Sequence, residues 1–357
     1  MDDFSETDLT DLSWDEDILG AGYRAATLDL GEDPDGEGTA VATLVRADHA
    51  IQATGDDPTA RPALLWVHGM SDYFFHTHVA ERCAEEGYPL YALDLRKCGR
   101  SHRPGQHWHY TSDLAHYYPE LTAAARLLAR QHGAVVPLAH STGGLVAALW
   151  LDHLQRTDPE LLASIPAAIL NSPWLDMPFP RPVVVGTKAL TTTVGRLRPF
   201  LSLPQKEISA YGQSLHRSHG GEWDYDTTMK PLSGHRKYYG WIEAIFQGQA
   251  ALRAQPPLEL PMLTLCSSRS WLGHEYSAAS DSADTVLDVE QVRRLAPDLS
   301  TRSTVIALDS ARHDVFLSTP LVREEAFAAT FGWLAEALGP DAADAADAAE
   351  SSEGPAR

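Results

Sequence analysis

A serine set in a turn of small residues is the first feature of the sequence that could do chemistry. The stretch Val135-Val-Pro-Leu-Ala-His-Ser-Thr-Gly-Gly144 passes from an apolar, strand-like run through Ser141 into a helical pattern. This order is that of the G-x-S-x-G nucleophile elbow, with Ala139 in place of the first glycine. A serine N-cap followed by glycines is the alternative, but the flanking strand and helix favour the elbow. We therefore predict that Ser141 is a nucleophile, and a serine hydroxyl needs a base to activate it.

The base has to be chosen from 16 histidines, and position along the chain decides the choice. In enzymes with such an elbow, the acid follows the serine along the chain and the histidine comes last. Residues 304–308 are the last predicted strand, which places His313 in the loop beyond it, at the carboxyl edge of the sheet. His313 is therefore the predicted base. His68 and His140 lie within tight turns and are interpreted as local hydrogen-bonding residues.

The acid of such a triad is expected after the predicted strand 262–266. The next residues, Ser267-Ser-Arg-Ser270, contain no carboxylate. A longer insertion, residues 271–283, then leads to Asp284. Asp284 precedes a Val-Leu pair that can anchor the loop in the core, so it is the predicted acid. Asp288 has the position of an N-cap for the following helix, and it stays an alternative together with Glu275.

Two backbone N–H groups are expected to stabilise a developing oxyanion. One belongs to Thr142, the residue after the nucleophile, at the start of a helix whose dipole favours negative charge. The other belongs to Met70, because His68-Gly69-Met70 follows the apolar run 63–67 and that loop supplies the second donor in such enzymes. Met70 and Thr142 are therefore the predicted oxyanion hole.

A sheet has to hold these residues, and the chain alternates strand-like with helical runs. An antiparallel hairpin at residues 23–46 comes first, and parallel neighbours linked by helical crossovers follow. This order predicts an α/β fold with a mostly parallel central sheet flanked by helices. The predicted strands are 23–30, 39–46, 63–67, 89–95, 135–139, 165–170, 262–266 and 304–308, and the predicted helices are 79–86, 121–130, 145–155, 289–295 and 324–338.

Composition divides the chain into four parts. Residues 1–22 form an acidic N-terminal segment, and residues 340–357 form an acidic, low-complexity tail. Residues 23–173 and 258–339 form the α/β core. Residues 174–257 are rich in Pro, Gly and aromatic residues and contain no strand-like run framed by helices, so we predict an inserted, largely helical cap over the strand ends. Disorder is expected only at the two ends.

Charge and composition exclude several classes of function. Of the net charge of −21, residues 1–17 carry −8 and residues 340–357 carry −4, and no cluster of Lys and Arg suits phosphate backbones or anionic lipids. We therefore expect no nucleic-acid partner. The N-terminus does not resemble a secretion signal, no apolar run reaches membrane-spanning length, and three distant cysteines indicate reduced thiols. A cytoplasmic protein without integral membrane association is expected, in an oligomeric state that the sequence does not specify.

Histidines near residue 106 could be taken for a metal site. His107 and His109 lie in Gln106-His-Trp-His109, with His102 and His116 nearby. Their spacing is not that of a zinc site, and no further Cys or His pair follows. We therefore predict no metal, and we interpret this segment as a loop near the rim of the substrate pocket.

Together these landmarks resemble the monoglyceride lipase and lysophospholipase branch of the α/β-hydrolases, often described as serine aminopeptidase-like. The resemblance implies an α/β-hydrolase fold, an ester or lipid-like acyl substrate, and no metal or cofactor. It also implies that Asp94 and Arg96 are structural turn residues. Ala139 and the insertion after Cys266 depart from the usual pattern of the branch. The resemblance covers about residues 63–338 and is carried by His68-Gly-Met-Ser-Asp-Tyr-Phe-Phe75, Asp94-Leu-Arg-Lys-Cys-Gly-Arg-Ser101, the elbow, Asp284-Thr-Val-Leu-Asp288 and Arg312-His313.

The expected function is hydrolysis of a carboxylic ester of a small molecule, through an acyl-enzyme intermediate. An acyltransferase that uses the same triad is one alternative. An aminopeptidase-like hydrolase is the other, and it would need a cap carboxylate, from Glu222, Asp224 or Asp226, to hold the ammonium of its substrate. Epoxide hydrolases and dehalogenases of this fold use an aspartate at the elbow, so the serine excludes them.

Overall fold

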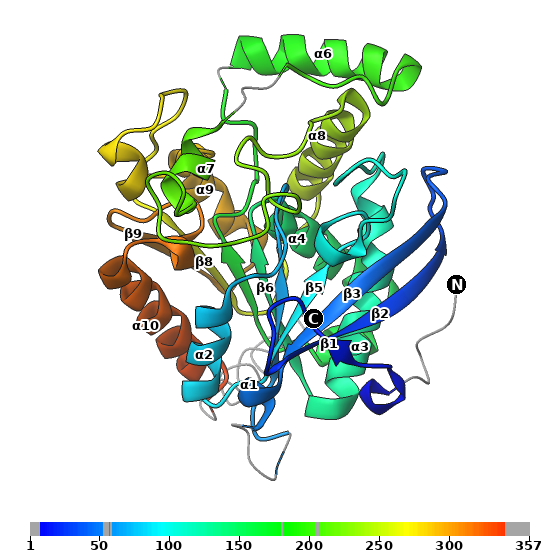
Figure 1. The fold of residues 1–357 in the computed structure, drawn as a ribbon, viewed down its shortest axis with the longest axis vertical. Helices are drawn as coiled ribbons and strands as arrows, with labels where there is room; N and C mark the ends of the chain where they lie inside the picture. The colour runs from blue at the N-terminus through cyan, green and yellow to red at the C-terminus, as the bar shows by residue number, and fades with distance from the viewer. Residues whose placement is uncertain (1–7, 53–56, 58, 180, 205–207, 340–357) are drawn as a thin grey trace, which may run out of the picture.

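A nine-stranded sheet forms the centre of the molecule, in the order β1-β2-β3-β5-β4-β6-β7-β8-β9 (Figure 1). The structure is a computed structural model that describes residues 8–52, 57, 59–179, 181–204 and 208–339. The strands are β1 (Asp15–Glu16), β2 (Tyr23–Glu32), β3 (Thr39–Ala47), β4 (Ala63–Val67), β5 (Leu90–Asp94), β6 (Val135–His140), β7 (Ala168–Asn171), β8 (Met262–Ser267) and β9 (Ser303–Leu308). The helices are α1 (Asp48–Gln52), α2 (Thr77–Glu85), α3 (Tyr118–His132), α4 (Thr142–Thr157), α5 (Pro159–Ala163), α6 (Arg181–Leu197), α7 (Ala210–Leu215), α8 (Tyr239–Ala254), α9 (Val289–Leu295) and α10 (Pro320–Ala337).

The direction of the strands follows from their connections. Strands β5, β4, β6, β7, β8 and β9 are parallel, each to its neighbour, while β1, β2 and β3 pair antiparallel and join β5 on one side. All eight predicted strands are present, with bounds that differ by at most three residues, and the sequence missed only the two-residue β1. Because the parallel strands all end at one edge, the loops that follow β4, β6, β8 and β9 meet there.

The sheet is buried on both faces, so its strands read as continuous apolar runs. In β4, Leu65 and Val67 join the core under α3, α4 and α8, whereas Leu64 and Trp66 join the core under α2 and α10. This alternation reflects the two-residue period of a strand. The helices that pack on both faces therefore hold in place the strand ends next to the predicted site residues.

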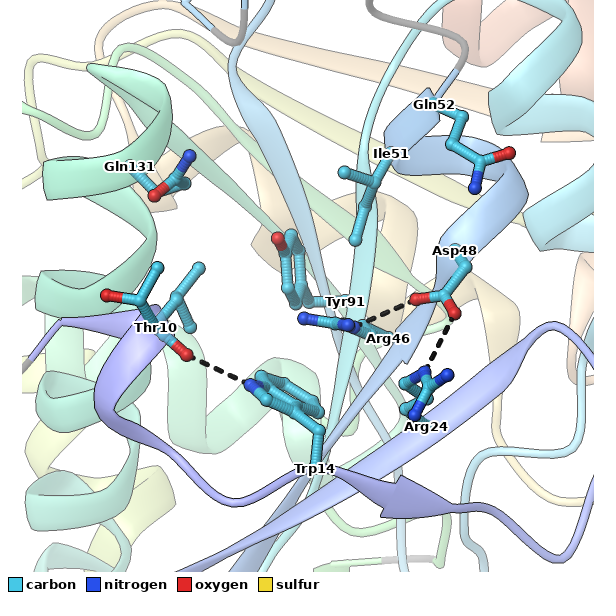
Figure 2. Close-up of a pocket in the computed structure, with 10 residues that line it drawn as sticks. Thr10, Trp14, Arg24, Arg46, Asp48, Ile51, Gln52, Tyr91 and Gln131 are labelled. Carbon is cyan, nitrogen blue, oxygen red and sulfur yellow. Dashed lines mark hydrogen bonds and ion pairs between the residues drawn. The ribbon is translucent and has the colours of Figure 1, made fainter.

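The N-terminal segment differs from the expectation of disorder at the ends. Leu9 is buried, and β1 pairs with β2 through Asp15 and Glu16. The indole of Trp14 lies under the guanidinium of Arg46, 4.4 Å from the ring centroid (Figure 2). The expectation was therefore wrong for residues 8–22, because these local contacts outweigh the acidic composition. The tail 340–357 lies outside the described residues.

Helices α6, α7 and α8 lie between β7 and β8 in the chain and stand beyond the carboxyl edge of the sheet (Figure 1). We keep the predicted bounds 174–257 for this part and call it the cap. Helix α8 packs on α4, and α6 packs on α8, so the cap is joined to the helix that starts at the elbow.

The turn after β5 carries three cations that are paired with carboxylates. Lys97 is fully buried, and its ammonium lies 2.9 Å from Asp33, 3.1 Å from Asp35 and 3.1 Å from Glu37, all in the connection between β2 and β3. In the same turn, Arg96 pairs with Glu120, and Arg100 pairs with Asp17 and Asp94. These pairs tie the antiparallel strands to the parallel half of the sheet. They also fit the implied role of Asp94 and Arg96 as structural residues.

Replacing Lys97 by methionine should lower the free energy of unfolding by about 3–5 kcal/mol, because three buried carboxylates would lose their counter-charge. Equilibrium urea unfolding measures this change. Arg293→Met is the control, since Arg293 forms an exposed pair with Glu290 at 3.0 Å, and its effect should stay below about 1 kcal/mol. Equal effects of the two substitutions would contradict a stabilising role for the buried cluster.

Candidate active site

The backbone of Ser141 is bent into a conformation that non-glycine residues rarely adopt, with φ at 54° and ψ at −117°. The surroundings hold it there. The Ser141 N–H donates to the carbonyl of Asn171 at 2.9 Å, and the Ser141 carbonyl accepts from the N–H of Trp174 at 3.0 Å. Both partners belong to the end of β7 and the loop after it. The bend between β6 and α4 is therefore fastened to the neighbouring strand.

Small residues around the elbow are required by contact distances. A Cβ atom on Gly143 would lie 2.4 Å from the carbonyl oxygen of His68, and one on Gly69 would lie 2.9 Å from Cβ of Ser141. Both distances are far below ordinary contact, so the loop after β4 passes directly beside the nucleophile. Ala139, two residues before the serine, is fully buried in β6 and pairs with Val67 of β4.

The imidazole of His313 lies between Ser141 and Asp284. Its Nε2 is 2.9 Å from Oγ of Ser141, and its Nδ1 is 2.8 Å from Oδ2 of Asp284. The three side chains are almost completely buried. This arrangement lets Nδ1–H donate to the carboxylate, which leaves the Nε2 lone pair free to accept the serine proton. The structure thus brings together the serine, histidine and aspartate that the sequence singled out.

Asp284 reaches His313 because the two ends of the long loop after β8 are hydrogen-bonded to each other. Ser270 pairs with Asp284 as an isolated bridge, in which Trp271 N–H donates to the Asp284 carbonyl at 2.7 Å. The residues between them therefore form a loop that returns to the end of the strand. The Asp284 carboxylate also accepts from the N–H groups of Val286 and Leu287 at 2.7 and 2.8 Å, which fixes its orientation toward the imidazole.

The two alternative acids occupy other places. Asp288 is the N-cap of α9, where its carboxylate accepts from the N–H of Glu290 at 3.1 Å, as the sequence predicted. Glu275 is exposed on the excursion. Among the described residues, neither of them forms a hydrogen bond or ion pair with His313, whereas Asp284 has a direct hydrogen bond to it.

Residues on either side of His313 hold its loop in place. The guanidinium of Arg312 donates to the carbonyl of Leu317 at 2.7 Å. Asp314 is fully buried, and its carboxylate accepts from His76 at 2.9 Å and from the amide of Asn171 at 2.8 Å. Burial alone would raise the pKa of Asp314, but the imidazoles of His140 and His76 and the Asn171 amide hold that pKa well below its usual range. Sequence reasoning missed Asp314, although its place beside His313 was a signal.

His68 and His140 make local hydrogen bonds, as predicted. His68 Nδ1 lies 2.7 Å from the Gly69 carbonyl and its Nε2 accepts from Leu95 N–H at 3.1 Å, while His140 Nδ1 lies 3.1 Å from the Asn171 carbonyl. The ring centroids of His140 and His313 lie 4.8 Å apart. Burial lowers the pKa of His140 to about 4, so this ring is neutral near pH 7. It therefore adds no positive charge beside an imidazolium at His313.

The predicted oxyanion donors follow directly after Ser141 and after Gly69 in the chain. Thr142 begins α4, and its backbone N–H lies at the helix start, where no carbonyl of the same helix can accept from it. Met70 follows Gly69, the residue that packs against Ser141. Within the described part of the chain, neither the N–H of Met70 nor that of Thr142 donates a hydrogen bond. Both donors are thus available to a ligand oxygen.

The histidine-rich segment near residue 106 makes protein contacts. His102 stacks on Trp108 with centroids 3.6 Å apart, and Trp108 stacks on His235 of the cap at 4.6 Å. His109 accepts from the N–H of Ser71, one residue beyond Met70. The segment therefore joins the cap to the loop that carries the predicted oxyanion donor. The hollow in Figure 2 lies elsewhere, under the N-terminal segment, and no predicted site residue lines it.

Comparisons with known proteins bear on the family and the fold of this chain. The family described as serine aminopeptidase, S33, matches residues 58–319. A soluble variant of the monoglyceride lipase of Saccharomyces cerevisiae, solved with a substrate analog, superposes with a TM-score of 0.60 at 17% identity, covering 87% of this chain and 96% of that one. The monoacylglycerol lipase of Paleococcus ferrophilus superposes with a TM-score of 0.57 at 21% identity, covering 79% and 96%.

These comparisons identify the α/β-hydrolase fold and a likeness to the monoglyceride lipase branch, as the sequence resemblance indicated. No curated protein matches the chain at a significant level. Within the described residues, every helix is too short or too polar to cross a bilayer.

Replacing Gly143 by alanine should lower the free energy of unfolding by about 1–3 kcal/mol, because the new methyl group overlaps the His68 carbonyl and must displace backbone. Thermal or urea unfolding measures the change. Gly332→Ala is the matched control, since Gly332 also lies in a helix but has open space at its Cβ. That substitution should raise stability by about 0.5–1 kcal/mol. A Gly143→Ala protein as stable as the wild type would show that the elbow is not tightly packed.

Proposed function

The chain belongs to the serine aminopeptidase S33 family of hydrolases, and on this basis we propose that it is a serine esterase that cleaves a carboxylic ester with a lipid-like or small acyl group. The observation that carries the proposal is the pair of hydrogen bonds from one imidazole, 2.9 Å to Ser141 Oγ and 2.8 Å to Asp284 Oδ2. The same arrangement underlies nucleophilic catalysis by serine on several unrelated folds.

In the proposed reaction, Ser141 Oγ attacks the carbonyl carbon of the ester while Nε2 of His313 takes the hydroxyl proton. The carbonyl oxygen becomes an oxyanion, which accepts from the N–H groups of Met70 and Thr142. Collapse of the tetrahedral intermediate breaks the bond to the alcohol oxygen, and His313 returns the proton to that oxygen. A water molecule then repeats the sequence on the acyl-enzyme and releases the acid. Asp284 orients the imidazole and stabilises its cationic form.

The cap carboxylates favour an ester over a peptide with a free amino terminus. Glu222, Asp224 and Asp226 are all exposed, whereas Ser141 is buried. Glu222 lies 3.4 Å from Arg323, and Asp224 lies 2.9 Å from Arg217. Two of the three groups that could hold a substrate ammonium are thus already paired with a cation at the surface. An aminopeptidase would need an unpaired carboxylate close to the nucleophile.

The surface of the cap supports an apolar acyl group. Eight of the ten exposed large hydrophobic side chains in the described residues lie between residues 179 and 208, on and around α6. Val185 and Leu197 of α6 are 68% and 76% exposed. Exposed apolar patches of this kind mark surfaces that meet apolar ligands or partners. We propose that this apolar surface of the cap meets the acyl group of a lipid-like ester.

A fluorophosphonate probe tests the proposed nucleophile. The wild type should be labelled and Ser141→Ala should not, and the wild type alone should hydrolyse p-nitrophenyl esters of graded acyl length. The esterase proposal fails if neither protein is labelled, or if Ser141→Ala keeps full hydrolysis. Repeating the assay with added alcohol or thiol acceptors separates hydrolysis from acyl transfer, because a transferase would form the new ester or thioester faster than the free acid.

The assignment of the acid can be tested with one matched pair of variants. Asp284→Asn should lower kcat by about 10³–10⁴-fold, because an amide no longer favours the tautomer that leaves Nε2 of His313 free to accept the serine proton. Asp288→Asn should leave kcat and stability unchanged, since Asn is as good an N-cap as Asp. Steady-state ester hydrolysis measures both. Normal turnover by Asp284→Asn together with a loss in Asp288→Asn would move the role to Asp288.

A further inference from the structure

Three consecutive residues after Met70 are each held by one segment of the cap. Ser71 Oγ accepts from the backbone N–H of His235 at 2.7 Å, and Asp72 Oδ1 accepts from the ammonium of Lys230 at 2.7 Å. The hydroxyl of Tyr73 accepts from the backbone N–H of residue 226 at 2.8 Å. We call residues 226–235 the strap. The strap therefore forms a hydrogen bond or ion pair with each residue from 71 to 73, in the loop that carries the predicted oxyanion donor.

Lys230 occupies a site built for an ammonium group. Its side chain and that of Asp72 are almost completely buried. The rings of Phe75, Tyr211 and Tyr225 surround the ammonium, with centroids 5.5, 5.6 and 5.8 Å away. Aromatic faces attract a desolvated cation and add to its pairing with a carboxylate. A buried lysine held by four groups fixes the position of the strap against the core.

This ammonium also supplies the positive charge for a buried cluster beside the base. Oxygen or nitrogen atoms of Asp72, His140 and Asp314 lie within 4.8 Å of one another, a donor set that elsewhere could bind a metal ion. Here Lys230 sits 2.7 Å from Asp72 and acts as the cation. The second oxygen of Asp72 has no hydrogen-bond partner among the described residues. Removal of Lys230 would thus leave a buried carboxylate without a counter-charge.

The loop that the strap holds is conformationally demanding. Ser71 has φ at 59°, in the left-handed region that non-glycine residues seldom adopt, and its N–H donates to His109. The N–H of Met70 belongs to the peptide between Gly69 and Met70, one residue before Ser71, so holding Ser71 restricts the backbone that sets the direction of this N–H. The cap also reaches the base, because the ring of Tyr211 meets that of His313 edge to face at 5.5 Å.

We propose that Lys230 is a positioning residue, which aims the N–H of Met70 at the oxyanion by fastening the strap to Asp72. This role rests on the proposed esterase function. Lys230 does not touch the reacting atoms, so its loss should weaken stabilisation of the transition state and leave substrate binding nearly unchanged. Removal of a complete oxyanion donor costs about 10²–10³-fold in kcat, and a displaced donor should cost about 10–10²-fold.

The test compares Lys230→Met with Lys237→Met. Lys237 lies just beyond the strap, is half-buried, and forms no ion pair within the described residues, so its replacement removes a cap ammonium but leaves the pair of Lys230 with Asp72 in place. Titration with a fluorophosphonate gives the concentration of reactive Ser141, and kcat is expressed per reactive site. Lys230→Met should lower kcat per site by about 10–10²-fold with KM within about twofold, while Lys237→Met should match the wild type.

Two further readouts separate positioning from a merely structural role. A trifluoromethyl ketone analogue of the ester forms an oxyanion on Ser141, so its inhibition constant should rise in Lys230→Met by the same factor as kcat/KM falls. Hydrogen–deuterium exchange of residues 68–75 should accelerate in Lys230→Met alone. An unchanged inhibition constant, or a loss of activity explained entirely by fewer reactive sites, would overturn the proposal.

A double variant covers the case in which Lys230→Met fails to fold. Asp72→Asn with Lys230→Met removes both buried charges and therefore avoids the unpaired carboxylate. If Lys230 positions the loop, the double variant folds and kcat stays low. If Lys230 only neutralises Asp72, kcat returns to the wild-type value and the proposal is overturned. The exchange measurement does not depend on turnover. Unchanged exchange in residues 68–75 would therefore contradict only the proposed role of Lys230 and the strap. A wild type that hydrolyses no ester would contradict the proposed function.

Discussion

The bend at Ser141 is the constraint on which the rest of the structure depends. A residue at φ 54° and ψ −117° is strained, and it persists only where its surroundings determine it fully. Hydrogen bonds to the end of β7, the glycines at 69 and 143, and the packing of α4 all hold this one residue. The strain places a hydroxyl at the start of a helix and at the carboxyl edge of the sheet, where an imidazole from a distant loop can meet it.

The other loops at this edge serve the same geometry by different means. The excursion after β8 closes on itself at Ser270 and Asp284, so a long insertion still delivers a carboxylate to the strand end. Asp314 anchors the His313 loop to Asn171 and His76. The cap holds the loop after β4 through Lys230, which adds a cation to a buried acidic cluster. The proposed catalytic geometry is thus shared between the core and the cap.

Local patterns predicted much of this arrangement. The elbow is a contiguous motif, and chain order with strand position selected His313 and Asp284, because each depends on only one strand and the loop after it. Contacts between distant segments were not predictable. Lys230 and Asp72 are 158 residues apart, and Arg100 pairs with Asp17 across 83 residues. Sequence periodicity does not predict such long-range pairs. The acidic start of the chain therefore suggested disorder, and no sequence pattern indicated the role of the strap residues.

The most direct test is to observe the acyl group on the serine. A slowly deacylating ester is mixed with the protein, the reaction is quenched in acid within the first turnover, and the peptide that contains Ser141 is analysed by mass spectrometry. The account predicts that this peptide gains the mass of the acyl group, in an amount that rises and falls with the burst of released alcohol. Alcohol release without an adduct on Ser141, or with the adduct on another residue, would contradict it.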